Sequence, residues 1–288
     1  MPRFSLLVLL AACGPPSERA VVLPVTFLIG DVEAACGEDV TAGLQPGAAQ
    51  LADARLYLSD IELRDSTGEW LTLPLDATSD WQTDRVVLLD AEDATGACSD
   101  SGTVETNRQI QGRIGDGTYD AIRFNVGLPF DLNHLDNATA PSPLNTQGMY
   151  WAWQAGYKSV RVDWVMADTP STRFNVHLGA TECASAGATV APQEPCGRPN
   201  LPRITLDAFD PWADGLTVHL DELVAGSALD ANTPSTPPGC MSDPLEGDDC
   251  VPVFDALGLD FDAGECAEDC GGQRVFTAQP SGVMGATP

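Results

Sequence analysis

The three histidines of the chain are its first candidates for metal chemistry, because neutral imidazole is the commonest metal ligand in proteins. His134 follows a strand-like segment in LPFDLNHLD, among polar residues of the kind of loop that carries functional sites. His177 in FNVHLG and His219 in LTVHLD point away from the apolar face of alternating segments. A single histidine is more often a surface or hydrogen-bonded residue. Placement favours His134 and His177 as ligands, with His219 as the third candidate.

Two tryptophans one residue apart, Trp151 and Trp153 in GMYWAWQAGYK, are the second unusual feature. Residues at i and i+2 of an extended segment project on the same side. The simplest interpretation is a pair of core aromatics that covers a β-sheet. Intact indole does not explain metal binding, because its nitrogen is only a hydrogen-bond donor.

The chain begins MPRFSLLVLLAACG, which is typical of a secretion signal over residues 1–12. Its apolar run is too short to span a bilayer, which takes about 20 residues. The letters LAAC, ending at Cys13, fit a bacterial lipobox, in which the cysteine is lipidated and becomes the new first residue. We therefore expect an exported protein in the periplasm or at the cell surface, held by a lipid anchor. Gly14 after the cysteine favours the outer membrane.

The chain has nine cysteines, and removal of the leader with lipidation of Cys13 leaves an even number. An even count in an exported protein predicts disulfides, although eight cysteines allow on the order of 100 pairings. A metal cluster at the last two cysteines is the alternative, but thiols outside the cytoplasm tend to oxidise. Short loops favour the pairs Cys183–Cys196, Cys240–Cys250 and Cys266–Cys270, which leaves Cys36–Cys98.

The composition narrows the functional classes. The chain has 42 acidic and 14 basic residues and a net charge of -28, which would repel a phosphate backbone, so no nucleic-acid partner is expected. Acidity by itself is typical of a solvated surface and names no ligand. The sequence contains no recognisable acid–base or nucleophile constellation, so we expect a protein that is not an enzyme.

Short alternating segments bounded by Gly, Pro, Asn and Asp must position these residues, and this pattern predicts half-buried antiparallel strands. The fold class is therefore all-β, an antiparallel β-sandwich or distorted barrel with a Cys-rich, loop-rich C-terminal appendage. Only residues 221–228 suggest a helical turn or two. The expected strands cover residues 21–29, 54–63, 86–89, 119–128, 159–165, 174–178 and 216–220.

The expected organisation follows from these signals. After the leader, residues 13–20 form a tether and residues 21–232 form the β-sandwich domain. Residues 233–276, rich in Pro, Gly, Asp and Cys, form a disulfide-stapled extension packed on the same domain. Residues 277–288 form a loose tail.

Four segments in order carry a resemblance to a known family. LPFDLNHLD (128–136), APSPLN (140–145), MYWAWQAGYK (149–158) and FNVHLGATEC (174–183) together resemble the MbnP family of exported copper-binding proteins. Members occur beside methanobactin genes and more widely in bacteria. The resemblance runs from the first strand through Cys240 and Cys250 to GGQRVF at 271–276.

The resemblance implies a copper site built from histidine and from a tryptophan oxidised to kynurenine by a partner di-haem cytochrome c peroxidase-like protein. Opening the indole ring would free an aryl amine with an available lone pair. Cu(I), the expected form of copper, favours imidazole and sulfur, so Met149 joins His134, His177 and the new amine as a candidate. Neutral imidazole is required, so binding should weaken below the ordinary histidine pKa of about 6.5.

One departure bears on the site. In functionally related surface proteins of methanotrophs, the oxidised tryptophan lies two residues before a ligating histidine. Here those positions hold Leu132, Asn175 and Thr217. The segment containing Trp151 and Trp153 must therefore reach the histidines through the fold, and the sequence does not say which tryptophan is modified.

We therefore expect a lipid-anchored, extracytoplasmic copper-binding protein that acts in copper acquisition or handling. One alternative is a β-sandwich surface module that binds a sugar or peptide through Trp151, Trp153 and Tyr157, because aromatic faces suit such ligands. Another is a structural surface lipoprotein whose tryptophans belong to its core.

Overall fold

Alternating apolar residues build the strands of this protein, as β1 (Glu18–Ile29) illustrates. Val21, Leu23 and Val25 are buried, while the residues between them face outward. The computed structural model describes residues 17–280 except 46, 101 and 153. The expected signal peptide, the lipidation site at Cys13 and Trp153 lie outside the described residues. The described chain is mostly strands, as the all-β prediction requires.

The larger sheet has nine strands and is organised around the long strand β4 (Gly47–Asp65). Its main order is β13-β8-β4-β11-β12-β15, and three further strands also pair with β4. The other strands of this sheet are β3 (Val40–Ala42), β5 (Trp70–Thr72), β6 (Val86–Asp90), β8 (Tyr119–Val126), β11 (Val160–Met166), β12 (Thr169–Leu178), β13 (Arg203–Asp207) and β15 (Gly239–Cys240).

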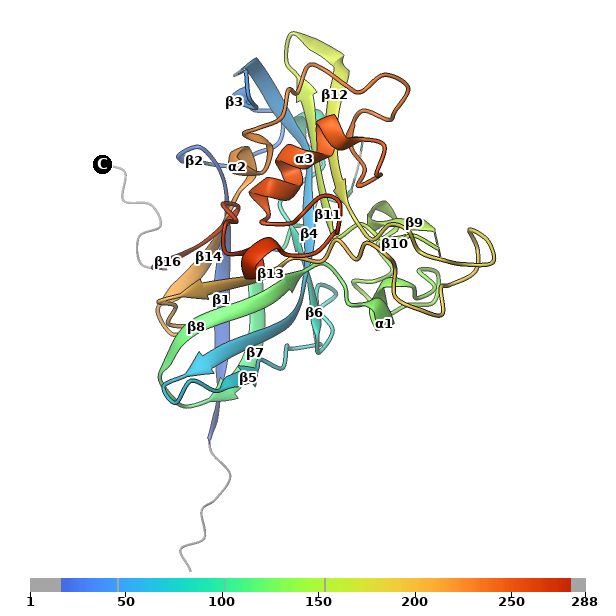
Figure 1. Cartoon of the computed structure of the whole chain (residues 1–288). Coiled ribbons are helices and arrows are strands. Elements are labelled where there is room, and N and C mark those ends of the chain that lie inside the picture. Colours follow the sequence, from blue (N-terminus) through green and yellow to red (C-terminus); the bar gives the residue numbers. More distant parts are fainter. Residues whose placement is uncertain (1–16, 46, 101, 153, 281–288) are drawn as a thin grey trace, which may run out of the picture.

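The smaller sheet has five strands and packs against the larger one over a shared core (Figure 1). Its order is β16-β14-β1-β2, and β7 also pairs with β1. Phe276 of this sheet meets Phe124 of β8 edge to face, with ring centroids 5.3 Å apart. The other strands are β2 (Val32–Glu33), β7 (Gln109–Gly115), β14 (Asp214–His219) and β16 (Phe276–Pro280).

Two strand pairings are parallel within this mainly antiparallel fold. β1 pairs in parallel with β14, and β12 pairs in parallel with β15. Parallel neighbours need a long crossover. Both pairs are far apart along the chain, so no local alternation pattern reveals them.

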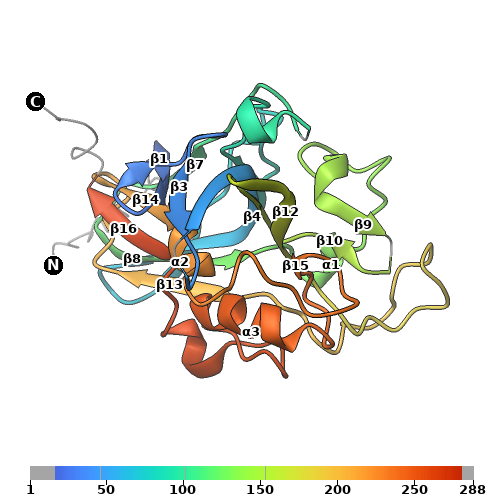
Figure 2. The same ribbon diagram turned by 90° about the horizontal axis from the view of Figure 1, so that it is seen from above.

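A separate hairpin carries the first tryptophan of the doublet. It consists of β9 (Tyr150–Ala152) and β10 (Gly156–Tyr157), preceded by the 3-10 turn η2 (Gln147–Met149). With α1 (Phe130–Asn133), it lies across the larger sheet from β1, β14 and β16 (Figures 1 and 2). A second core cluster, which includes Tyr57, Met149 and Tyr157, packs beneath it.

The C-terminal part is more ordered than the sequence predicts. The short helix α2 (Leu220–Val224) agrees with the expected turn, but α3 (Gly247–Ala256) was not predicted. Val253 and Phe254 are fully buried, and their contacts with the core stabilise the helix. The loose tail expected from residue 277 is also wrong at its start, because β16 extends to Pro280 and pairs with β14.

Four disulfides join the eight cysteines, and all four expected pairs are confirmed: Cys36–Cys98, Cys183–Cys196, Cys240–Cys250 and Cys266–Cys270. The first and last lie at the 3-10 turns η1 (Gly96–Cys98) and η3 (Ala267–Cys270). Disulfides are typical of extracytoplasmic proteins. Within the described residues, no helix is long and apolar enough to cross a bilayer.

Candidate metal centre

Two hydrogen bonds at and just after β10 fix the hairpin that carries Trp151. The Tyr157 N–H donates to Oδ1 of Asn133 at 3.0 Å, next to α1. The Ser159 N–H donates to the carbonyl of Leu178 at 2.6 Å, at the end of β12. Trp151 is therefore held between the helix that precedes His134 and the strand that contains His177.

The indole of Trp151 lies directly on the backbone of Gly179. A Cβ added at that glycine would lie 2.4 Å from Cζ3 of Trp151, well inside van der Waals contact. Glycine is therefore required where the ring crosses the chain. Gly179 directly follows β12, so the ring lies at the end of the strand that contains His177.

Met241 reaches the same place from the C-terminal part of the chain. The parallel register pairs Asn175 with Gly239 and Val176 with Cys240, and one further step brings Met241 beside His177. Ser242 secures this position, because its hydroxyl donates to the His177 carbonyl at 3.1 Å and accepts from the Gly179 N–H at 3.2 Å.

Trp151 and Met241 line one open cleft of about 570 Å³. Its wall also includes Cys183 and Glu246. Burial raises the pKa of the Glu246 carboxyl, whose Oε2 accepts the Met241 N–H at 2.6 Å. The cleft thus combines an aromatic ring, a thioether and a carboxyl group on a rigid backbone.

The imidazole of His177 is oriented by Asp163 on the neighbouring strand. Nε2 of His177 lies 2.8 Å from Oδ1 of Asp163. Burial disfavours the charged form of Asp163, but its hydrogen bond to His177 and the charges of His177 and Arg161 hold its pKa below the ordinary value. An ionised carboxylate only accepts hydrogen bonds, so Nε2 carries a proton. A neutral His177 therefore keeps its lone pair on Nδ1.

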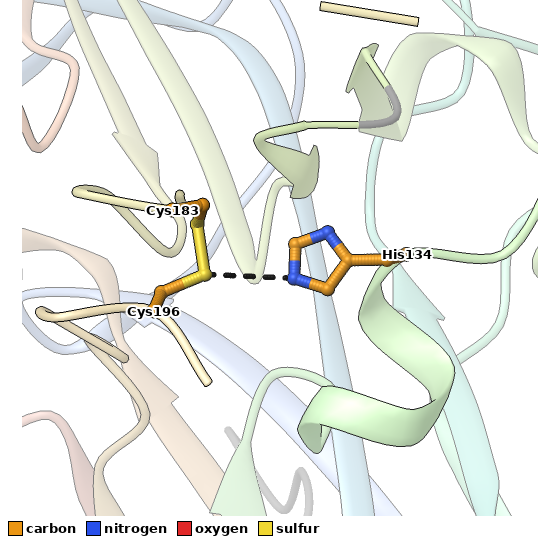
Figure 3. Close-up of side chains that lie close together, drawn as sticks. All are labelled: His134, Cys183 and Cys196. Carbon is orange, nitrogen blue, oxygen red and sulfur yellow. Dashed lines mark hydrogen bonds between the residues drawn. A yellow bond between two sulfur atoms is a disulfide. The ribbon is translucent and has the colours of Figure 1, made fainter. Parts of the chain in front are cut away.

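His134 occupies a different environment. It is buried, packs edge to face on Phe130 with ring centroids 5.2 Å apart, and directs Nε2 toward Sγ of Cys196 at 3.5 Å (Figure 3). With Cys183, it forms a group whose potential ligand atoms lie within 4.8 Å of one another. The disulfide between Cys183 and Cys196 occupies both sulfurs, so this group is not a thiolate site in the oxidised protein.

The structure divides the predicted ligands among three places. His134 faces the Cys183–Cys196 disulfide, whereas His177 faces Asp163, and no described contact joins the two imidazoles. His219 lies in β14, across the molecule from the hairpin, with Nε2 2.9 Å from Oγ1 of Thr277 (Figures 1 and 2). The geometry thus favours His177 and removes His219 from the candidate site.

Two further residues differ from expectation because they are buried. Met149 is fully buried in the second core cluster, where its thioether packs among apolar side chains. Tyr157 is also fully buried, and its hydroxyl donates to the Leu144 carbonyl at 2.5 Å. Tyr157 therefore cannot form an exposed stacking platform with Trp151 and Trp153, and Trp153 itself lies outside the described residues.

Met241 is the site residue that sequence reasoning missed. It stands in a segment rich in Pro, Gly and Asp, without alternation or any motif near a histidine. Only the parallel pairing of β15 with β12 brings it to His177. Imidazole and thioether are donors that suit Cu(I), so the residues present fit that ion.

Comparison with known proteins gives one family match and one similar solved structure. The sequence model of the MbnP family matches residues 18–242. The solved structure of MbnP from Methylosinus trichosporium is similar, with a TM-score of 0.78 and 28% sequence identity, over 92% of this chain and 99% of that chain. No significant match was found among curated proteins.

Proposed function

Because the chain belongs to the MbnP family, we propose that it is an extracytoplasmic copper-binding protein that acts in copper acquisition or handling. The observation that carries this proposal is the cleft that Trp151 and Met241 line together, next to the end of β12 that contains His177. The protein acts as a binder and not as an enzyme, with copper as its cargo.

Two donors are ready without modification. Nδ1 of His177 is the nitrogen that the Asp163 hydrogen bond leaves available, and Met241 supplies a thioether. Both suit Cu(I), which accepts few ligands and favours soft ones. Asp163 acts as the outer partner that fixes the tautomer and orientation of a ligating histidine.

Trp151 is the tryptophan that we propose to be oxidised to kynurenine. Its ring lines the cleft, whereas an unmodified indole offers no lone pair to a metal. Opening the ring would place an aryl amine in the cleft beside the thioether of Met241. The oxidant in this proposal is a partner di-haem cytochrome c peroxidase-like protein, and the cleft gives that oxidant or its product access to the ring.

The proposal also includes the cellular location. Four disulfides support an oxidising compartment. The lipobox ending at Cys13 supports a lipid anchor, most consistent with the outer membrane. A tethered binder with a net charge of -28 would remain soluble at the membrane surface and would concentrate cations near it.

The test is copper binding by protein produced with and without the partner peroxidase. Cu(I) affinity is measured by competition with a chromophoric chelator, and peptide mass spectrometry locates any oxygen gain in the segment containing Trp151 and Trp153. We expect the parent protein produced with the partner peroxidase to bind one equivalent of Cu(I). His177→Ala and Met241→Leu should lose it, and Asp163→Asn should weaken binding by about 10–100-fold.

His219→Ala is the matched control, because it removes an imidazole that lies across the molecule. It should bind copper like the parent. Full binding by His177→Ala, or oxidation confined to Trp153 with unchanged copper binding by Trp151→Phe, would refute the proposed site.

A further inference from the structure

The Cys183–Cys196 disulfide and His134 form a group that the proposed copper site does not use. All three side chains are buried, and Nε2 of His134 lies 3.5 Å from Sγ of Cys196 (Figure 3). It is the one group of three such side chains with metal-ligand spacing in the described part of the chain. The other disulfides have no histidine within such a group.

Neighbouring contacts place Nε2 of His134 at the disulfide. The backbone N–H of Tyr157 donates to Oδ1 of Asn133, so the amide nitrogen of Asn133 must face the other way. That nitrogen lies 3.4 Å from Nε2 of His134 and is a donor. Nε2 of His134 therefore lies between the Asn133 amide and Sγ of Cys196.

The two sulfurs face different spaces. Cys183 lines the open cleft of about 570 Å³, whereas Cys196 and His134 line a small cavity of about 40 Å³. An external thiol would therefore approach Cys183 from the cleft. The sulfur released would be that of Cys196, as a thiolate next to the imidazole of His134.

We propose that Cys183–Cys196 is a reducible disulfide that, once opened, forms with His134 a second site for a soft, thiophilic cation such as Cu(I). A dithiol reductant is required. Its first thiolate attacks Cys183, which forms a mixed disulfide and releases Cys196 as a thiolate. Its second thiol then displaces Cys183, and the reductant leaves as a disulfide. The protein gains two electrons and two protons, and metal binding releases both protons from the thiols.

The reduced site would offer two thiolates and one imidazole, a donor set that selects soft metals. The ligands of this second site do not include His177 or Met241. An experiment can therefore refute the second site without refuting the proposed copper site. Cys183 lines the same cleft as Met241 of the proposed copper site. The reduced protein could therefore hold a second cation close to the first.

The test uses the full chain under native conditions. Reductant is added in steps, free thiols are alkylated, and peptide mass spectrometry locates the label. We expect Cys183 and Cys196 to be labelled before Cys240 and Cys250, whose side chains are fully buried. Reduced protein is then titrated anaerobically with Cd(II), and the ultraviolet thiolate-to-metal band should rise to one equivalent.

Three variants make the result specific. A Cys183→Ser, Cys196→Ser double variant, checked for folding by circular dichroism, should show no band. His134→Gln should keep the thiols but weaken Cd(II) binding by at least about 10-fold, the loss that even an outer partner produces. His177→Ala should show the full band, which separates this site from the copper site.

Simultaneous labelling of all four disulfides would overturn the proposal, because it would mean that the thiols appear only on unfolding. Absence of the Cd(II) band from selectively reduced protein, or equal affinity of parent and His134→Gln, would do the same.

Discussion

His134 and His177 show how a neighbouring side chain decides what a histidine can do. Asp163 accepts from Nε2 of His177 and leaves Nδ1 available, whereas Nε2 of His134 lies between the Asn133 amide and Sγ of Cys196. The first imidazole can bind a cation beside Met241. The second faces a disulfide and can bind one only after reduction. Sequence position alone does not distinguish them.

The buried carboxyl of Asp90 gives a second prediction at the scale of single residues. Asp90 lies in β6 opposite Arg55 of β4, and its Oδ1 accepts the Glu92 N–H at 3.1 Å. Burial raises the pKa of Asp90 to about 8, partly offset by the charge of Arg55, while Glu92 adds to the rise. The folded protein thus binds a proton that the unfolded chain releases near the ordinary value of 3.8.

This carboxyl should make stability fall as pH rises. Between about pH 4 and pH 8 the folded state holds more protons than the unfolded state, so the Asp90 contribution declines through that range and is constant above it. Asp90→Asn removes the effect. Its free energy of unfolding relative to the parent should increase by a few kcal/mol from pH 5 to pH 8, measured by urea unfolding. Asp84→Asn, on the exposed turn before β6, should keep the parental pH profile.

At the scale of elements, β15 determines whether Met241 lies near His177, the other proposed donor. This strand has only two residues, but its parallel pairing with β12 sets the position of Met241. The Cys240–Cys250 disulfide joins it to α3, which packs its apolar face on the core. β15, the Cys240–Cys250 disulfide and α3 therefore hold Met241 next to the strand that contains His177.

Gly239→Ala should release this element. Gly239 has φ +78°, and a Cβ there would lie 2.3 Å from the backbone oxygen of Asn175, which cannot move without breaking the sheet. We expect β15 to detach from β12. Faster amide exchange at Cys240 and weaker Cu(I) binding would show this, while other strands remain protected. Gly272→Ala, which meets nothing within 4 Å, should leave both measurements unchanged.

At the scale of the whole molecule, the last strand closes the fold. β16 pairs with β14 in the smaller sheet, and Phe276 reaches across to Phe124 of the larger sheet. Residues 277–280, which the sequence assigns to a loose tail, therefore extend the strand that carries this contact. The hairpin of β9 and β10, which carries Trp151, lies on the opposite side of the larger sheet (Figures 1 and 2).

Phe276→Ala should test this role. The side chain is 2% exposed, so its truncation leaves a cavity between the sheets and should cost about 3–5 kcal/mol of unfolding free energy. Urea unfolding followed by circular dichroism measures the loss. Gln279→Ala, an exposed position on the same strand, should change stability by less than about 0.5 kcal/mol. Similar effects of both variants would mean that β16 does not connect the sheets.

The sequence by itself determined seven of the strands, the all-β class, the four disulfides and the importance of the segment around Trp151. These features follow from local patterns: alternation along one strand, short loops between cysteines and two large side chains at i and i+2. Tertiary structure decided that Met241 and not Met149 approaches the site, that Tyr157 is buried, and that His134 and His177 have separate partners. The reason is physical. The lateral register of β12 and β15 joins residues more than sixty positions apart, and it depends on how the whole core packs.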